Sequence, residues 1–243
     1  MPTESDLRYL GHRPFFTFFS NLLDARFFAS EHSEPVRILE IGCGPGEFAH
    51  MLKQKYGNKV DIVAIDPGDN VALAQKNYSS NGVEYKQATV EDIKEDASFD
   101  VCLFSKSLHH CMPLHETVVK THALLKQHGV CVAEELDRDQ VNSKTATWFS
   151  DRLDLLRLGG LIFDKTPEEH EAQGDSEELC AHMFDVSKPG YDRLREFYKD
   201  HLVNEELHTL PIIMDELYKS FGEKNVKVAS VIPFLHEFLI FLG

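Results

Sequence analysis

The fold is decided by the stretch Arg37-Ile38-Leu39-Glu40-Ile41-Gly42-Cys43-Gly44-Pro45-Gly46-Glu47-Phe48. Its apolar start, residues 37–41, alternates too little for a half-exposed strand and predicts a strand buried on both faces of a parallel sheet. Glycines follow at every second position, where the lack of a Cβ permits a sharp turn and close approach of a ligand. Residues 47–53 then begin an amphipathic helix. Strand, glycine turn and helix N-terminus together predict a site for a polar ligand, with free N–H groups and the positive end of a helix dipole.

A carboxylate inside the predicted strand narrows the choice of ligand. Glu40 stands two residues before Gly42, so it would repel a pyrophosphate but suits a ligand with an ammonium or sulfonium charge. The glycine spacing also differs from the dinucleotide pattern G-x-G-x-x-G. The run 39–46 closely resembles the first motif of the class I S-adenosylmethionine-dependent methyltransferases. The alternative interpretation is a strand-to-helix turn that binds no ligand.

Length and composition indicate one large α/β domain. The chain has 243 residues, 42% hydrophobic and 27% charged, which allows a substantial core. The net charge of −15, from 40 acidic and 25 basic residues, argues against nucleic acid and anionic membranes as partners. Five cysteines without a C-x-x-C pair favour reduced thiols and a cytoplasmic location. We expect neither a signal peptide nor a membrane-spanning segment.

A second buried strand is predicted over residues 59–65, and it ends in Asp66-Pro67-Gly68. Asp66 lies about 20 residues past the glycines, where a carboxylate can accept hydrogen bonds from both ribose hydroxyls. The Pro-Gly pair that follows also favours a plainer interpretation, in which Asp66 only forms a turn. The sequence alone leaves both roles open.

Two further strands are predicted over residues 83–88 and 98–105. After the first of them, the resemblance implies that the chain contacts adenine. The family often has Asp or Asn there, whereas this chain has Ala followed by Thr89. Either Thr89 or Glu91 would then supply the polar contact, and Val90 would pack on the adenine ring.

Two adjacent histidines follow the strand that ends at Ser105. Because ligands of open α/β sheets bind beyond the carboxyl ends of the strands, His109 and His110 should face the reacting centre. Histidine titrates near neutral pH and can take a proton from an attacking hydroxyl or amine, while packing or capping is the alternative. With Cys111 and His115 they also suggest a metal site. Adjacent histidines rarely point the same way and no carboxylate spacing matches, so we predict no metal.

The rest of the chain predicts covering helices and a terminal hairpin. Phenylalanine-rich residues 7–29 predict one or two helices that pack on the sheet or form a lid over the ligand. A fifth strand over 130–136 ends near Glu134 and Glu135, which could hold a basic substrate, act as a base or be solvated. The strand pattern then stops until residues 225–242, which read as two strands joined by a short turn.

The resemblance to class I methyltransferases implies a doubly wound α/β fold. Its mostly parallel sheet would have seven strands with an antiparallel last strand, plus a helical lid insertion. The single domain would comprise an N-terminal helical cap (1–34), a cofactor-binding core (35–136), a helical substrate cover (137–222) and a terminal β-hairpin (223–243). The family function is transfer of a methyl group from S-adenosylmethionine to a small-molecule acceptor by in-line displacement, at oxygen, nitrogen or carbon.

The resemblance also implies roles for individual residues. The implied cofactor-binding residues are Glu40, Gly42, Cys43, Gly44, Gly46, Asp66, Pro67, Thr89, Val90 and Ser105, and the implied catalytic residues are His109 and His110. A rival hypothesis keeps the cofactor but not methylation: the chain would catalyse a cyclisation or rearrangement, or serve as a partner-binding subunit. An NAD-type dehydrogenase is disfavoured by the glycine spacing and the terminal hairpin.

Overall fold

The protein is represented by a computed structural model that describes residues 4–29, 34–78, 80–136, 143–159, 207–231 and 236–242, together with 188, 189, 192, 193 and 196. The chain divides into two compact units. The larger consists of Thr3–Leu136, Leu210–Val231 and His236–Gly243, and the smaller of Met1–Pro2, Asp137–Thr209 and Ile232–Leu235.

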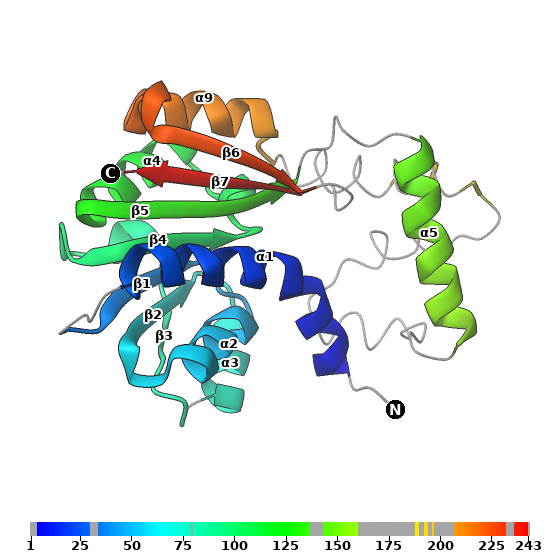
Figure 1. Cartoon of the computed structure of the whole chain (residues 1–243), viewed down its shortest axis with the longest axis horizontal. Helices are drawn as coiled ribbons and strands as arrows, with labels where there is room; N and C mark the ends of the chain where they lie inside the picture. Colours follow the sequence, from blue (N-terminus) through cyan, green and yellow to red (C-terminus); the bar gives the residue numbers. More distant parts are fainter. Residues whose placement is uncertain are drawn as a thin grey trace. The chain divides into compact units, whose positions relative to one another are not determined.

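The larger unit is built on a sheet with the strand order β3-β2-β1-β4-β5-β7-β6 (Figure 1). The predicted parallel sheet is confirmed by β1 (Val36–Ile41), β2 (Val60–Asp66), β3 (Glu84–Gln87), β4 (Phe99–Ser105) and β5 (Leu125–Leu136). Beyond them, β7 (His236–Leu242) pairs antiparallel with both β5 and β6 (Val226–Val231). The chain order reverses between β1 and β4, which makes their carboxyl ends the expected place for a ligand.

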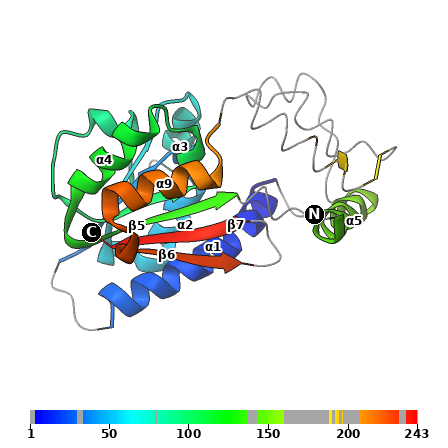
Figure 2. The same cartoon turned by 90° about the horizontal axis from the view of Figure 1, so that it is seen from above.

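Helices cover both faces of this sheet, with α1 on one side and α4 and α9 on the other (Figure 2). The helices are α1 (Glu4–Phe27), α2 (Glu47–Tyr56), α3 (Asn70–Tyr78), α4 (Leu114–Leu124) and α9 (Leu210–Phe221). Short 3-10 turns are η1 (Gly57–Lys59), η2 (Val90–Asp92), η3 (Leu108–His110) and η5 (Glu223–Asn225). In β1, Ile38 packs with α1, α2 and α3, and Leu39 packs with α4 and α9. The strand is therefore buried on both faces, as its apolar run predicts.

The N-terminal helix packs on the sheet through its phenylalanines. Phe15, Phe19 and Leu23 recur every four residues, lie on one face of α1 and are fully buried. The Phe15 ring stacks on Phe48 of α2 with 5.2 Å between ring centroids. The packing interpretation of this segment is thus confirmed for these residues.

Helix α9 belongs to the sheet unit, although the sequence analysis placed residues 137–222 in a cover. Ile213, Leu217 and Phe221 form an apolar stripe and are buried in the core that α9 shares with α4. The sequence also predicts a helix over residues 204–220 that Pro211 would interrupt, but Pro211 is the second residue of α9. Proline is tolerated in the first turn because its missing N–H would have no partner there.

Strand β5 begins earlier than its apolar run suggests. The sequence predicts a helix from Leu114 to Lys126, ended by His128 and Gly129, and then a strand from Val130. In the structure, α4 ends at Leu124 and β5 starts at the next residue. The pairing of β5 with β4 shifts register between Phe99 and Val101, and His128 has a φ of 67°. His128 and Gly129, which the sequence suggests as the end of a helix, therefore lie in an irregular part of β5.

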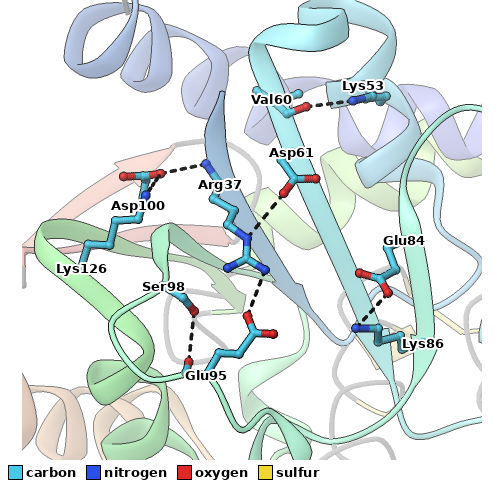
Figure 3. A network of polar contacts seen from close by, with 10 residues as sticks. All are labelled: Arg37, Lys53, Val60, Asp61, Glu84, Lys86, Glu95, Ser98, Asp100 and Lys126. Atoms are coloured by element: carbon cyan, nitrogen blue, oxygen red, sulfur yellow. Dashed lines mark hydrogen bonds and ion pairs between the residues drawn. The ribbon is translucent and has the colours of Figure 1, made fainter. Parts of the chain in front are cut away.

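The amino-terminal ends of the strands are linked by charged groups (Figure 3). The backbone N–H of Arg37 donates to Asp100 at 2.8 Å. The guanidinium of Arg37 donates to Glu95 at 3.0 Å, and its Nε lies 3.5 Å from the carboxylate of Asp61. Lys126 also donates to Asp100, at 2.8 Å. Partly exposed ion pairs contribute about 1 kcal/mol or less each to the free energy of unfolding. We therefore infer that the main effect of these contacts is to align neighbouring strands in register. They lie at the edge of the sheet opposite the carboxyl ends.

The smaller unit contains α5 (Ser143–Leu158), which starts five residues before the helix that the sequence predicts from Trp148. The buried guanidinium of Arg193 makes two hydrogen bonds of 2.9 Å with the carboxylate of Asp154 on this helix. The acidic stretch 164–178 lies outside the described residues. Among the helices of the described chain, none combines the length and apolarity needed to cross a membrane.

Candidate functional site

A pocket of about 530 Å³ lies where β1, β2, β3 and β4 end. It is lined by residues from the segments that follow these strands, within 41–44, 66–70, 88–91 and 106–112, and by Thr117 of α4. Its volume falls in the range of small-molecule sites. All of these residues belong to the larger unit.

The three glycines after β1 have left-handed backbones but serve different purposes. The φ angles of Gly42, Gly44 and Gly46 are 77°, 49° and 86°. A Cβ at Gly42 would collide with Ser107, and one at Gly46 would lie 2.8 Å from the Tyr85 ring. A Cβ at Gly44 would meet nothing within 4 Å. Packing therefore requires the outer two glycines, and Gly44 alone leaves open space beside the pocket.

The turn offers fewer free N–H groups than the sequence analysis expects. The N–H groups of Gly42 and Cys43 both donate to the Ile65 carbonyl, at 2.8 and 2.9 Å. The Gly44 N–H donates to Asp66 Oδ2 at 2.8 Å. The prediction of free donors is therefore wrong for these three groups, because neighbouring β2 already supplies their acceptors.

Asp66 forms the turn that the sequence suggested, and it also has acceptor positions at the pocket. Its Oδ2 accepts the Gly44 N–H, and its Oδ1 accepts the Gly68 N–H at 2.8 Å, which is the turn-forming bond. Asp66 also lines the pocket. A carboxylate oxygen can accept two hydrogen bonds, so each oxygen of Asp66 keeps capacity for a ligand hydroxyl.

Glu40 lies behind the turn and does not line the pocket. It is 1% exposed, and within the described residues its Oε2 has no hydrogen-bond partner. Burial raises the pKa of Glu40 to about 8, with smaller contributions from Glu47 and Asp66, while a hydrogen bond from the Ala49 N–H opposes the shift. A buried carboxyl with an unpartnered oxygen is an acceptor for a cationic or N–H group of a ligand.

The segment after β3 presents an apolar floor and a carboxylate. Val90 is 2% exposed and lines the pocket. The Thr89 hydroxyl donates to Asp92 at 3.1 Å, so its proton is committed to the cap of η2. Glu91 lines the pocket and accepts the Thr117 hydroxyl at 2.9 Å. Of the two alternatives for an amine contact, Glu91 therefore offers more free acceptor positions.

The two histidines occupy different environments. His109 is 5% exposed, and its Nδ1 lies 2.6 Å from Glu135 Oε2. The other oxygen of Glu135 accepts the Leu108 N–H at 2.9 Å. His110 is exposed and lines the pocket, and its ring centroid lies 4.3 Å from that of His109. Glu135 is thus a buried partner of His109, not a solvated charge, and His110 is the histidine that faces the pocket.

The structure separates the remaining candidates into two groups. Those that line the pocket are Gly42, Gly44, Asp66, Pro67, Thr89, Val90 and His110, whereas Glu40, Cys43, Gly46, Ser105 and His109 are absent from its lining. Cys43 is buried, with its thiol 3.6 Å from the Gly44 carbonyl. The Ser105 hydroxyl donates to Glu134 at 3.4 Å.

The sequence predicts that residues 106–113 face the reacting centre, but it assigned no role to Lys106 or Ser107, which also line the pocket. Lys106 has a φ of 59°, and the Ser107 hydroxyl donates to the Ile41 carbonyl at 2.5 Å. Their position directly after a strand that ends at the pocket was the available signal. Burial raises the pKa of Cys111 to about 12, so this lining residue is a neutral thiol at pH 7. The described residues include no group of three His, Cys, Asp or Glu side chains that could hold a metal ion.

The comparisons with known proteins point to one family. Residues 39–133 match the family model described as a methyltransferase domain. The ubiquinone biosynthesis O-methyltransferase of Rickettsia bellii (strain OSU 85-389) is 25% identical over 103 residues, 42% of this chain and 43% of that protein. The malonyl-[acyl-carrier protein] O-methyltransferase of Priestia megaterium (strain DSM 319 / IMG 1521) is 29% identical over 110 residues, 45% and 38% of the two chains. The matches thus span less than half the length of these relatives.

Solved structures show the same fold. The plantazolicin methyltransferase BpumL in complex with SAH superposes with a TM-score of 0.60 and 15% identity, covering 98% of this chain and 87% of that chain. The CurJ carbon methyltransferase gives a TM-score of 0.57 and 15% identity, covering 93% and 53%. Residues 39–133 thus match a methyltransferase domain, and the chain shares the α/β, Rossmann-like fold of these solved methyltransferases.

Proposed function

We propose that the protein binds S-adenosylmethionine in the pocket between β1, β2 and β4 and transfers its methyl group to a small-molecule acceptor. The observation that carries this proposal is the grouping of Gly44, Asp66 and His110 around one pocket of about 530 Å³. Gly44 leaves open space for the cofactor, Asp66 can accept hydrogen bonds from its hydroxyl groups, and His110 can act as the base in the reaction.

The residues present fit the cofactor in four places. The open space at Gly44 admits the methionine portion close to the main chain. Asp66 keeps acceptor capacity for the ribose hydroxyls. The unpartnered oxygen of buried Glu40 suits the ammonium group, which would lower the pKa of Glu40 by placing a positive charge beside it. Val90 would pack against adenine, with Glu91 or Thr89 near its amine.

The chain's own contribution to the reaction is orientation and proton removal. The bound cofactor supplies a methyl group on a positively charged sulfur, a reactive electrophile. The pocket walls hold the acceptor in line with that methyl group, and such positioning can supply a large share of the acceleration. If the acceptor atom carries a proton, His110 is placed to take it. Glu135 pairs with His109, and the ring of His109 contacts that of His110. Glu135 and His109 thus help to position His110, which is the proposed base.

The net charge of the chain and the names of its relatives support a choice of methyl-acceptor class. An acidic chain with a net charge of −15 favours a small molecule over a nucleic acid. The relatives are named for O-methylation and a structural neighbour for carbon methylation, so oxygen and carbon acceptors are the first to test. We further propose, from the family resemblance, that residues between β5 and α9 contribute to acceptor choice.

The test is to incubate the protein with S-adenosylmethionine and a panel of phenols, carboxylic acids and β-dicarbonyl compounds. We expect S-adenosylhomocysteine to accumulate in a one-to-one ratio with a methylated product, and His110→Ala to slow its formation by roughly a hundredfold. If the protein binds S-adenosylhomocysteine yet converts acceptors without releasing it, the rival hypothesis of a non-methylating enzyme would replace this one.

A further inference from the structure

We propose that Lys106 is a carboxylate-binding residue of the pocket. The carboxylate has two possible sources that share this chemistry: the amino-acid end of the cofactor and an acidic acceptor. The inference rests on the proposed function, because it assumes that the pocket takes the cofactor and its acceptor.

The glycine turn cannot supply the donors that a carboxylate needs. The N–H groups of Gly42, Cys43 and Gly44 already donate to acceptors on β2. The Gly46 N–H donates to the Cys43 carbonyl at 3.0 Å. An anion that leaves water must find charged or hydrogen-bonding partners in its new environment. Its partner in this pocket must therefore come from another segment.

Lys106 is placed to be that partner. Its half-buried side chain lines the pocket. Its ammonium makes no hydrogen bond or ion pair with any residue in the described part of the chain. This is notable in a chain with 40 acidic residues and 25 basic ones, where many lysines are paired. The group is thus available to a ligand.

The backbone at Lys106 is held in an unfavourable conformation by its surroundings. Its φ of 59° is uncommon for a residue with a side chain. The backbone N–H of Lys106 donates to the Glu134 carbonyl at 3.0 Å. The hydroxyl of the next residue, Ser107, donates a hydrogen bond to the Ile41 carbonyl. These two bonds fix the turn after β4 and aim it at the pocket. Strain that its neighbours maintain in this way is typical of binding and catalytic positions.

The other charges of the pocket favour the same assignment. Among the described lining residues, Lys106 is the one Lys or Arg, and the carboxylates are Asp66 and Glu91. Asp66 accepts two backbone N–H groups and Glu91 accepts the Thr117 hydroxyl, all from the segments after β1 and β2 or from α4. These acids suit hydroxyl and amine groups of a ligand. A carboxylate would be attracted to the segment after β4, where Lys106 and His110 lie.

The first experiment compares two ligands by calorimetry. S-adenosylhomocysteine carries the amino-acid carboxylate, whereas 5′-methylthioadenosine has the same nucleoside and sulfur without it. If the cofactor is the source, Lys106→Met lowers the affinity for S-adenosylhomocysteine by roughly tenfold or more and leaves that for 5′-methylthioadenosine unchanged. Lys106→Arg, which keeps the charge, should retain most of the affinity. Lys76→Met, which removes an exposed lysine from α3 outside the pocket, is the matched control.

The second experiment detects an acceptor as the source. If Lys106→Met binds both ligands like the wild type, the acceptor panel is repeated with each carboxylic acid beside its neutral amide. A preference of the wild type for the acids that Lys106→Met loses, and Lys106→Arg keeps, supports the proposal. The proposal is overturned if Lys106→Met and Lys106→Arg match in both experiments. Failure of the proposed function looks different, because the wild type itself would then bind neither nucleoside.

Discussion

Two of the segments that line the pocket, the glycine turn at residues 42–46 and the segment 106–112 after β4, are built in opposite ways. In the turn, the N–H groups have intramolecular partners and two glycines are required by packing against Ser107 and Tyr85. In the segment after β4, Lys106, His110 and Met112 direct side chains to the pocket, and Met112 is 54% exposed. The turn provides shape, and the later segment provides side-chain chemistry.

The two segments should therefore tolerate amino-acid substitutions to different degrees. A residue whose conformation is fixed by buried neighbours cannot change without a loss of stability. A side chain that extends into a pocket can change with an effect on binding or rate alone. Substitutions of the first kind should therefore lower the free energy of unfolding, and those of the second kind should change ligand affinity or rate.

Gly46→Ala should reduce the free energy of unfolding by about 3 kcal/mol, because its Cβ would approach Tyr85 and Ala74 in a backbone that disfavours side chains. Gly44→Ala should cost only about 1 kcal/mol of strain but lower the affinity for S-adenosylhomocysteine at least tenfold. Urea unfolding and calorimetry on both variants measure these effects. Equal losses of stability would contradict the separate roles of the two glycines.

Glu40→Gln should change the pH dependence of stability and binding. The pKa of Glu40 is raised by burial from its ordinary value of 4.5 to about 8, so between these values the folded protein holds a proton that the unfolded chain releases. Stability from this group therefore falls as the pH rises from about 4.5 to about 8, and the Gln variant should lack that decline. Urea unfolding from pH 5 to pH 8.5 measures it.

The same group links cofactor binding to proton release. A ligand with an ammonium group favours ionised Glu40, so the affinity of the wild type should rise by up to about tenfold per pH unit below pH 8. Calorimetry in buffers of different ionisation enthalpy would detect close to one released proton at pH 6.5. An unchanged proton count in Glu40→Gln would show that another group is responsible.

Glu135→Gln should slow methyl transfer by roughly tenfold, because it weakens the bond that orients His109 beside His110. The affinity for S-adenosylhomocysteine should stay the same. The matched control is Glu134→Gln, a buried neighbour on β5 that bonds Ser105. Single-turnover rates with an acceptor from the panel compare the two, and equal rates in both variants would remove the positioning role of Glu135.

The smallest effect is expected in α4. Thr117→Val removes a hydrogen bond to Glu91 and should cost about 1 kcal/mol of stability. Thr121→Val, one turn later, removes a buried hydroxyl that has no partner within the described residues, so it should be neutral or slightly stabilising. Thermal unfolding of both variants provides the comparison, and a larger loss in Thr121→Val would contradict it.

The sequence could predict the parts of the site that depend on local backbone chemistry. The apolar run before Gly42, the glycines themselves and Asp66 at the end of β2 each carry their signal within a few residues, and the parallel sheet follows from them. The sequence could not reveal that Glu135 pairs with His109, because this contact joins η3, which follows β4, to β5, and the alignment of β4 with β5 depends on the irregular start of β5.

Two other errors have the same origin in tertiary contacts. Nothing in the run 42–46 indicates that its N–H groups are taken by Ile65 and Asp66, since those acceptors lie on another strand. The assignment of α9 to a cover failed because an amphipathic helix does not reveal which apolar surface it meets. Local patterns thus predicted elements, and packing decided how those elements served the site.

The central claim is that the pocket beside Gly44 and Asp66 binds the cofactor of methyl transfer. The most direct measurement is a calorimetric titration of the wild-type protein with S-adenosylhomocysteine, on material that unfolds cooperatively. We expect saturable binding of one molecule per chain, and we expect Gly44→Ala to weaken it. An absence of binding by the folded wild-type protein would contradict it.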